Sequence, residues 1–599
     1  MNTTSPTYTE RLTALRRELT RQGANGFLVP MADRYQNEYV PPDSKRLAWL
    51  TGFTGSAGLV VVLDDRAAAF TDGRYTLQIR DQVDAALYEL CHITEQPPAD
   101  WIAEHLPAGG KLGYDPWLFT TNGVERYRAA AERAGGTLLA LAENPIDAVW
   151  SDQPPPPLAP VEPHLLDYAG ESAADKRSRL AEALKAAGRS ATVITAPDSI
   201  AWLLNIRGGD VSHTPLPLSF AILHDDGHCA LFIDPRKVGD GLEAHLGNQV
   251  SLRPPEDFGP ALDALGEGEA CVQVDPALNA AWVFERLQAA GARLERAPDP
   301  CQLPKAIKNA VELDGARAAH RRDGAAVARF LHWLSAQAPA GGIDEMTAEA
   351  RLEGYRQENE LFRELSFPTI TGAGPNGAIV HYRVTPESNR QLGAGELYLV
   401  DSGAQYLDGT TDITRTVAIG TPSAEMRDRF TRVLKGHIAL ATCRFPKGTT
   451  GAHLDTLARQ YLWQAGLDFD HGTGHGVGSY LNVHEGPQRI SRVSHDQALL
   501  PGMIVSNEPG YYKTDAYGIR IENLVAVRAA EIDGAEREMF EFETLTRAPI
   551  DRSLIDATLL TASEREWLNR YHAAVYEALS PQVDDATCEW LDEATRPLT

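Results

Sequence analysis

The sequence predicts an α/β, or α+β, protein made of two similar α/β blocks and a larger third block. Two proline-rich breaks mark the blocks. The stronger break runs from Asp152 through the four prolines 154–157, which exclude a helix or a central strand and form a stiff linker. The weaker break spans residues 297–300. Because domains usually contain about 100–200 residues, we expect three of them, at 1–152, 164–304 and 305–599.

The first two blocks share one order of elements. Each has an amphipathic helix pattern, an apolar strand, an Ala-Trp-Leu segment, a second strand, an Asp-Asp turn and a third strand. In the first block these elements are 10–21, 26–29, 48–50, 59–63, 64–65 and 67–70. In the second block they are 174–187, 191–196, 201–203, 220–224, 225–226 and 229–233. Duplication of one α/β unit explains this order, although chance similarity of such short motifs remains open.

The third block combines a long helix with strands and glycine turns. Its helical pattern spans 306–337, and a helical extension covers about 550–599. The β-like runs 396–400 and 413–419 flank a Leu-Asp-Gly-Thr turn at 407–410, which predicts a hairpin. Most of the histidines and acids with catalytic potential lie in this block.

Composition excludes several classes of protein. The chain has 599 residues, of which 43% are hydrophobic and 23% charged, as in an ordinary globular protein. It lacks the roughly 18–20 consecutive apolar residues of a membrane span, and its first twenty residues are too polar for a secretory signal. The net charge of −26 would repel nucleic acid, and the six cysteines form no CxxC pair. We therefore expect a cytoplasmic protein with reduced thiols and neither a membrane nor a nucleic acid as partner.

Two aspartates form the first part of a candidate metal site. Asp401 ends an apolar strand, where a carboxylate is costly unless it is paired or bound to a metal. Asp412 follows the predicted turn, so a hairpin would bring the two side by side. A divalent cation would remove their mutual repulsion. The alternative is that both aspartates cap turns, and Asp408, in an Asp-Gly turn, fits that alternative better.

A glycine-rich segment supplies three histidines, His471, His475 and His484. Glycines allow the backbone to approach a site closely, and three histidines within fourteen residues are hard to explain as structural alone. The alternating glycines resemble a dinucleotide loop, but no strand and helix frame surrounds them and no ribose-binding acid follows. The zinc motif HExxH is absent as well.

Two glutamates complete the set. Glu508 follows an apolar run, and a two-residue period places Arg520 and Glu522 on one face of a strand. Taken alone, each glutamate would be interpreted as a surface acid or an ion-pair partner. The ordered combination of Asp, Asp, His, Glu and Glu is a hard-ligand set suited to two divalent ions such as Mn²⁺ or Mg²⁺.

The motifs that carry these residues resemble a known family. They are VDSGAQYLDGTTDITRT, HGTGHGVGSYLNVHEGP, SNEPGYY and YGIRIEN. The third block resembles the "pita-bread" catalytic domain shared by aminopeptidase P, prolidase, methionine aminopeptidase and creatinase. LAWLTGFTGSAG, FTDGRY and EREWLNRYH extend the resemblance over essentially the whole chain, to the three-domain cytosolic aminopeptidase P group. The first two blocks would then be creatinase-N-like domains.

The resemblance implies a role for each candidate residue. Five residues would hold two divalent ions, most simply Mn²⁺, with Zn²⁺ or Co²⁺ as alternatives: Asp401, Asp412, His475, Glu508 and Glu522. Asp412 and Glu522 would bridge the ions, and Arg520 would hold a bridging acid in place. Glu508 would also transfer protons. The non-ligand histidines would be His381, His471 and His484, and Asp408 would not be a ligand.

The implied activity is release of the first residue from peptides with proline in second position, through a hydroxide that bridges the two ions. The implied partners are such peptides and a second copy of the chain in a homodimer. Prolidase, which acts on Xaa-Pro dipeptides, is the alternative within the class. A creatinase-like hydrolase without metal and a non-catalytic pita-bread binding module are further alternatives, but neither requires all five ligands.

Overall fold

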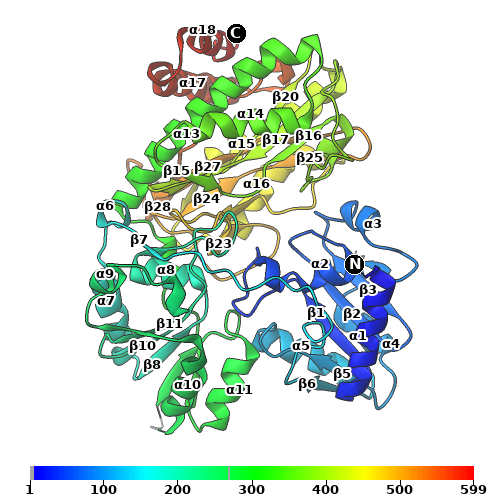
Figure 1. The fold of residues 1–599 in the computed structure, drawn as a ribbon. Helices are drawn as coiled ribbons and strands as arrows, with labels where there is room; N and C mark the ends of the chain where they lie inside the picture. The colour runs from blue at the N-terminus through cyan, green and yellow to red at the C-terminus, as the bar shows by residue number, and fades with distance from the viewer. Residues whose placement is uncertain (1–5, 268–269) are drawn as a thin grey trace. The chain divides into compact units, whose positions relative to one another are not determined.

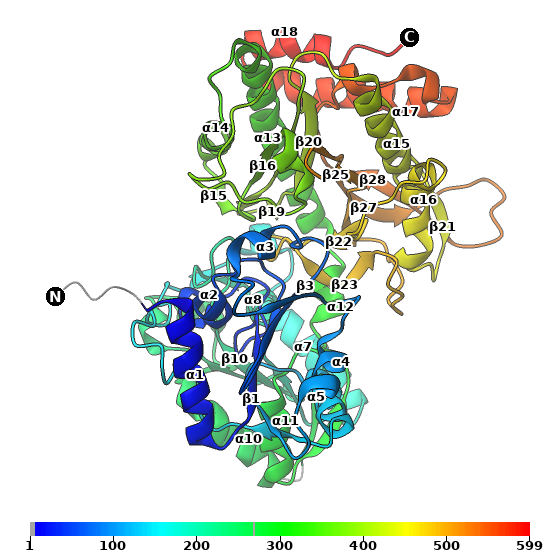
Figure 2. The same ribbon diagram turned by 90° about the vertical axis from the view of Figure 1, so that its right-hand side faces the viewer.

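The computed structural model describes residues 6–267 and 270–599, which form two compact units. Unit 1 comprises the described residues up to His164 together with Glu171–Cys301, and unit 2 comprises Leu165–Gly170 and Gln302–Thr599. Figures 1 and 2 show strands and helices in both units, which confirms the predicted mixed α/β class. Among the described helices, none has both the length and the apolar character that crossing a membrane requires.

Unit 1 contains two six-stranded sheets of the same topology. In sheet order, the first consists of β4 (Glu89–His92), β3 (Ala67–Thr71), β2 (Leu59–Leu63), β1 (Gly26–Pro30), β5 (Lys111–Tyr114) and β6 (Thr137–Ala140). The second consists of β12 (Val250–Arg253), β11 (Cys229–Phe232), β10 (Phe220–His224), β8 (Ala191–Ile194), β13 (Cys271–Val274) and β14 (Arg293–Arg296). Strands β1 and β8 each pair antiparallel on one side and parallel on the other. The matching order confirms the predicted duplication.

The helices of unit 1 also correspond between the two halves. The first half contains α1 (Tyr8–Gln22), α2 (Arg46–Thr51), α3 (Gln78–Gln82), α4 (Pro98–His105) and α5 (Thr121–Arg133). The second half contains α7 (Ala173–Ala186), α8 (Pro197–Leu204), α9 (Leu242–Leu246), α10 (Phe258–Glu267) and α11 (Ala281–Ala289). Helix α1 begins with a capping box between Thr7 and Glu10, and α7 begins with the side chain of Ser172 accepting from the Asp175 N–H. Both Ala-Trp-Leu segments lie in helices, α2 and α8.

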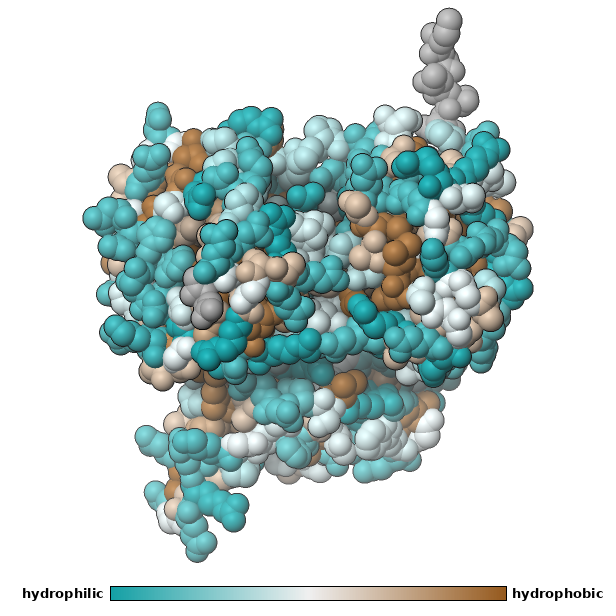
Figure 3. All heavy atoms as spheres, turned by 90° about the horizontal axis from the view of Figure 1, so that it is seen from below, coloured by the Kyte–Doolittle hydropathy of each residue, from teal (hydrophilic) through white to brown (hydrophobic). Residues whose placement is uncertain are grey.

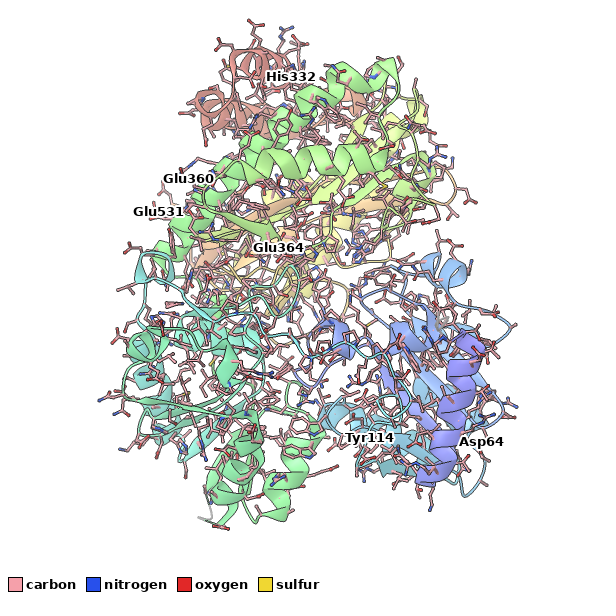
Figure 4. The ribbon with its side chains drawn as sticks, in the orientation of Figure 1. Asp64, Tyr114, His332, Glu360, Glu364 and Glu531 are labelled. Atoms are coloured by element: carbon pink, nitrogen blue, oxygen red, sulfur yellow. The ribbon has the colours of Figure 1, made fainter. Side chains whose placement is uncertain are left out.

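The long helix of unit 2 differs from the prediction at its start. A short α12 (Gln302–Ala306) precedes α13 (Ala310–Gln337), so the predicted helix 306–337 is wrong over its first residues. The cause is a capping box in which Asn309 accepts from Glu312 N–H and the Glu312 carboxylate accepts from Asn309 N–H. The tail helices α17 (Ala562–Leu579) and α18 (Asp585–Ala594) confirm the helical extension. His332 of α13 lies beside α18, stacked on Trp590 (Figure 4).

The candidate site residues lie in the strands of unit 2 or in the segments that connect them. One sheet consists of β16 (Ile370–Ala373), β17 (Leu397–Ser402) and β20 (Ile413–Ala418), and another of β15 (Phe362–Leu365), β18 (Ala404–Tyr406) and β19 (Gly409–Thr410). The six-stranded sheet consists of β21 (Arg444–Pro446), β28 (Met539–Thr544), β27 (Asn523–Ala529), β24 (Ile504–Asn507), β22 (Gly474–Gly476) and β23 (Glu485–Ile490). Strands β25 (Gly510–Lys513) and β26 (Tyr517–Arg520) pair with each other. Helices α13 and α14 (Glu345–Gln357) share a core cluster with β17 and β20, whereas α15 (Ala424–Ala441) and α16 (Gly451–Trp463) contact each other.

The predicted hairpin consists of two nested strand pairs. Strands β17 and β20 pair antiparallel as expected, but the Asp-Gly turn itself connects the inner pair β18 and β19. In the outer pair, the residue directly opposite Asp401 is Thr414 rather than Asp412. The expectation that the two aspartates face each other across the ladder is therefore wrong by two residues. Asp412 enters the site from the segment between β19 and β20.

The surface and the thiols agree with the composition. Hydrophilic residues cover most of the face shown in Figure 3, as a net charge of −26 leads one to expect. None of the six cysteines, which all lie in the described residues, forms a disulfide, and four of them are buried. The buried thiols of Cys91 and Cys229 have their pKa raised to about 12 by burial, which disfavours the reactive thiolate.

Candidate active site

Asp401 and Asp412 are buried carboxylates with unpaired oxygens. Strand β17 is buried along its whole length and carries Asp401, which is 8% exposed, and Asp412 is 4% exposed. The Oδ1 atom of each is buried without a hydrogen-bond partner among the described residues. Leaving a buried acceptor unsatisfied costs about 1–3 kcal/mol, and more for a charged group. Oxygens in this situation are suited to coordinating a cation.

His475 joins the aspartates from strand β22. Its Nε2 lies 3.5 Å from Asp412 Oδ2 and 3.5 Å from Glu508 Oε1. Its Nδ1 lies 2.9 Å from Gly476 O, which fixes the ring so that Nε2 faces the acids. The preceding Gly474 is necessary for this approach, because a Cβ there would lie 2.0 Å from Ser506 O. This bears out the expectation that glycines bring the backbone close to the site.

The two glutamates enter from loops at strand ends. Glu508 directly follows β24, and its Oε1 accepts a hydrogen bond of 3.1 Å from Ser506 Oγ. Glu522 lies between β26 and β27, and its Oε2 accepts from Thr414 Oγ1 at 2.7 Å. Ligand atoms of Asp412, His475 and Glu522 all lie within 4.8 Å of one another. The structure thus gathers three of the five candidate ligands around one point, and Glu508 reaches it through its contact with His475.

The electrostatics of the cluster show excess negative charge in a buried place. Burial raises the pKa of Asp412 to about 6, and the charges of Asp401 and Glu508 add to the effect. Burial and the neighbouring carboxylates Asp412 and Asp401 raise the pKa of Glu522 well above its usual value. Burial lowers the pKa of His475, but the hydrogen bond to Asp412 and the charge of Glu508 outweigh it and raise that pKa to about 9. Divalent cations would neutralise this repulsion.

Arg520 connects several members of the cluster. Its Nη2 donates to Asp401 Oδ2 at 2.6 Å, and its Nε donates to Thr414 Oγ1 at 3.1 Å. Because Thr414 donates in turn to Glu522, Arg520 contacts one carboxylate directly and a second through the threonine. Strand β26 ends at Arg520, so Glu522 does not share its strand as the two-residue period predicted. Ile521 and Glu522 form the two-residue link between β26 and β27.

The three non-ligand histidines have different surroundings. The ring of His484 lies edge to face against His475, with 4.3 Å between centroids. His471 Nε2 lies 2.8 Å from the Tyr512 hydroxyl, and its Nδ1 lies 4.0 Å from Glu508 Oε2. His381 is half-buried and follows Val380, whose carbonyl accepts from Arg520 Nη2 at 3.4 Å. The backbone therefore brings each of the three segments to the cluster.

Asp408 lies outside the cluster, as its turn position predicted. It is on the turn between β18 and β19 and forms an ion pair with Arg322 of α13.

Three residues that support the cluster were not identified from the sequence: Thr414, Ser506 and Tyr512. Thr414 was accessible in principle, because it lies two residues after Asp412 and a strand period of two places it on the same side. Ser506 has the same relation to Glu508. The Tyr512 hydroxyl accepts a hydrogen bond of 2.5 Å from Arg520 Nη1 and also lies 2.8 Å from His471 Nε2, so it links the two side chains. No local pattern indicates this contact, because it depends on how β25 pairs with β26.

The Tyr512 contacts lead to a prediction. Tyr512→Phe keeps the ring but removes the hydroxyl that joins Arg520 to His471. Because a hydrogen bond contributes about 0.5–1.5 kcal/mol, we expect kcat/KM to fall by about 2- to 10-fold with metal content unchanged. Steady-state kinetics and elemental analysis on the same preparation measure both. Tyr511→Phe on the neighbouring position is the matched control and should leave kcat/KM unaltered.

A histidine nitrogen among four carboxylates is a donor set suited to the divalent ions that metal-dependent hydrolases use. Residues 314–529 match metallopeptidase family M24, and 538–598 match the C-terminal region of peptidase M24. Residues 11–149 and 152–312 each match a creatinase/prolidase N-terminal domain. These matches confirm the predicted creatinase-like domains ahead of a metallopeptidase domain.

Full-length relatives narrow the assignment. The chain is 40% identical to aminopeptidase P2 of Arabidopsis thaliana, covering 98% of this chain and 88% of that protein. It is 40% identical to a probable Xaa-Pro aminopeptidase P of Paracoccidioides brasiliensis, covering 98% and 99%. The crystal structure of the X-prolyl aminopeptidase of Caenorhabditis elegans, described as a cytosolic enzyme with a di-nuclear active site, is 34% identical with a TM-score of 0.94, covering 99% and 100%. The chain therefore belongs to metallopeptidase family M24, in the group of these aminopeptidase P relatives.

Proposed function

We propose that this enzyme is a metal-dependent aminopeptidase that releases the first residue of peptides with proline in second position. The observation that carries the proposal is the buried cluster of Asp412, His475 and Glu522, with Asp401 and Glu508 beside it. Two relatives that match over nearly their whole length are named a probable Xaa-Pro aminopeptidase P and an X-prolyl aminopeptidase. A prolidase is the alternative that shares this metal chemistry.

Five side chains would hold two divalent ions. They are Asp401, Asp412, His475, Glu508 and Glu522, of which Asp412, His475 and Glu522 have ligand atoms within 4.8 Å of one another. The orphaned Oδ1 atoms of Asp401 and Asp412 fit this role, as does the di-nuclear site described for the Caenorhabditis elegans relative. Oxygen-rich ligation without a thiolate favours Mn²⁺, with Zn²⁺ or Co²⁺ as alternatives. When bound, the pair of cations would supply Lewis acidity and a water of low pKa.

Glu508 is the residue we assign to proton transfer. It is partly exposed, it follows β24 directly, and Ser506 orients it through a hydrogen bond to Oε1. Its Oε2 lies 4.0 Å from His471 Nδ1, so the carboxylate stands between two histidines. From that place Glu508 would take the proton of the attacking water and pass it to the prolyl nitrogen, which must be protonated to leave.

The remaining side chains would bind and orient the peptide. His484, which packs edge to face on His475, would hydrogen-bond the scissile carbonyl as charge develops on its oxygen. His381, in the segment between β16 and β17, would also hydrogen-bond the peptide. The free α-amino group would lie against Asp401, which explains why a single residue is removed. Arg520 would hold the Asp401 carboxylate in place through its 2.6 Å hydrogen bond.

Three broader assignments complete the proposal. We divide the chain into domains at 1–152, 164–304 and 305–599, the last with a helical extension from about 550. Support comes from the two repeated sheets and from the boundary between units at Cys301 and Gln302. A cytoplasmic location is supported by the cytosolic relative of Caenorhabditis elegans. Homodimer formation is an expectation from the family, and light scattering of the purified protein tests it.

A panel of peptides tests the proposed activity. We expect an Arg-Pro-Pro peptide to release its first residue, and its N-acetylated form to be inert because the free amine is the anchor. Replacement of the second residue by alanine should slow release strongly, since the proline ring fills its own pocket. Products are followed by mass spectrometry. Cleavage of an Xaa-Pro dipeptide alone, with the longer peptide untouched, would identify a prolidase instead, and no cleavage at all would support a binding module.

A further inference from the structure

Glu345, at the start of α14, is a buried carboxylate that takes no part in the site described above. It is 0% exposed and accepts hydrogen bonds at both oxygens. Oε1 accepts from Ala373 N–H at 2.7 Å, and Oε2 accepts from Arg390 N–H and from the Tyr382 hydroxyl, each at 3.0 Å. The Asn376 amide lies 3.0 Å from both oxygens.

All four donors belong to one segment, residues 373–390, which connects β16 to β17. This segment carries His381, and β17 carries Asp401 farther along the chain. Tyr382, next to His381, is fixed by Glu345 and by Ser388, whose Oγ lies 2.9 Å from the tyrosine hydroxyl. Glu345 N–H also donates to Arg390 O at 3.0 Å, so the end of the segment is held at two points. A single side chain thus fixes the segment on both sides of His381.

The opposite side of the same segment packs against β26. A Cβ at Gly518 would lie 1.7 Å from Gly377 O, so the two backbones touch directly there. Arg520, two residues farther along β26, donates to Val380 O at 3.4 Å. The residue before His381 is therefore tied to the cluster, and the residue after it is tied to Glu345.

A buried carboxylate is suited to this task because it is purely an acceptor. Burying the charge is costly, so its retention here requires that every direction be filled by a donor, as the contacts above achieve. A glutamine of the same size would turn its NH₂ group toward Arg390 N–H or Ala373 N–H, where only an acceptor fits. Glu345→Gln therefore keeps the volume and loses the arrangement of the segment.

We propose that Glu345 is a positioning residue for the reaction: through Tyr382 and the backbone of 373–390 it holds His381 against the substrate. The inference rests on the proposed role of His381 in binding the peptide. It adds Glu345 and Tyr382 to the residues that determine turnover, although neither is assigned to touch the substrate or the ions.

The test is a double-mutant cycle on the full-length, metal-loaded enzyme with an Arg-Pro-Pro peptide. We expect Tyr382→Phe and Glu345→Gln to lower kcat/KM by about 5- to 10-fold and by about 10- to 100-fold, with metal content retained. In the His381→Ala background the same changes should have less than about twofold effect, because the group they position is absent. Tyr382→Phe keeps the experiment decisive if Glu345→Gln fails to fold.

Glu564→Gln is the matched control. Glu564 is also a buried glutamate in the first turn of a helix, accepting from Thr561 N–H at 2.8 Å and from Lys435 Nζ at 2.5 Å. The Glu564→Gln change should lower the melting temperature and leave kcat/KM unaltered, both with His381 present and in the His381→Ala background. If Glu345→Gln and Tyr382→Phe each lowered kcat/KM by the same factor with and without His381, the positioning role of Glu345 would be overturned, while the proposed function would stand. Full activity of His381→Ala would overturn the proposed role of His381, and the inference with it.

Discussion

Asp412→Asn is expected to abolish both metal binding and turnover. Asp412 is 4% exposed, its Oδ1 is unpaired, and its Oδ2 lies 3.5 Å from His475 Nε2, so the carboxylate faces the cluster with one oxygen free to bind a cation. An asparagine offers one neutral oxygen and places an NH₂ group where a cation would lie. We expect kcat to fall by about 10³-fold or more, and the bound metal to fall with it. Glu522→Gln should behave in the same way.

The matched control is Asp408→Asn, four positions earlier in the same segment. Asp408 is paired with Arg322 on the turn between β18 and β19 and lies outside the cluster. This variant should retain its metal and its kcat, while losing some stability from the ion pair. Turnover rates and elemental analysis on the same samples distinguish Asp412→Asn from Asp408→Asn. Retention of full metal content by Asp412→Asn would contradict its assignment as a metal ligand.

His484→Ala is expected to lose most turnover while it keeps its metal. The imidazole packs on His475 and is assigned to the substrate carbonyl, so its removal takes away a donor needed in the transition state. Loss of one such donor costs about 10²- to 10³-fold in kcat. The backbone should not move, because the next residue, Glu485, is buried and paired with Lys305 at 2.7 Å and with Lys308.

A nearby histidine provides the comparison for this variant. His495 is half-buried, and its Nε2 lies 3.0 Å from Arg489 O, outside the cluster. We expect His495→Ala to have the kinetics and metal content of the unmodified enzyme. If His484→Ala instead lost both ions, His484 would have to be reassigned from the substrate to the metal.

The candidate ligands were predictable because most of them lie at or just after an apolar strand, where a charged residue stands out in the sequence. Asp401 ends a fully buried strand, and Glu508 follows another, so a charged residue after an apolar run marked both positions. His475 stood out as one of three histidines within fourteen residues among glycines, and in the structure Gly474 beside it makes a backbone contact that no side chain would permit. The duplicated domains were predictable for a similar reason, since apolar strands recur in the same order around an Asp-Asp turn.

The contacts between distant segments were not predictable. Which residue lies opposite Asp401 depends on the nesting of two strand pairs, and a shift of two residues is invisible in the local pattern. The role of Glu345 depends on Tyr382, 37 residues away, and on backbone donors that any residue supplies. The start of α13 is different: Asn309 followed by Glu312 is a readable capping signal, and a continuous helical pattern concealed it.

The central claim is that peptide cleavage depends on two divalent ions held by the cluster. The most direct measurement is a titration of chelated, dialysed enzyme with Mn²⁺, Co²⁺ or Zn²⁺ while release from an Arg-Pro-Pro peptide is followed and bound metal is counted. We expect no turnover without metal and a rise in turnover that reaches its plateau at about two ions per chain. Full activity in enzyme shown by elemental analysis to be metal-free would contradict it.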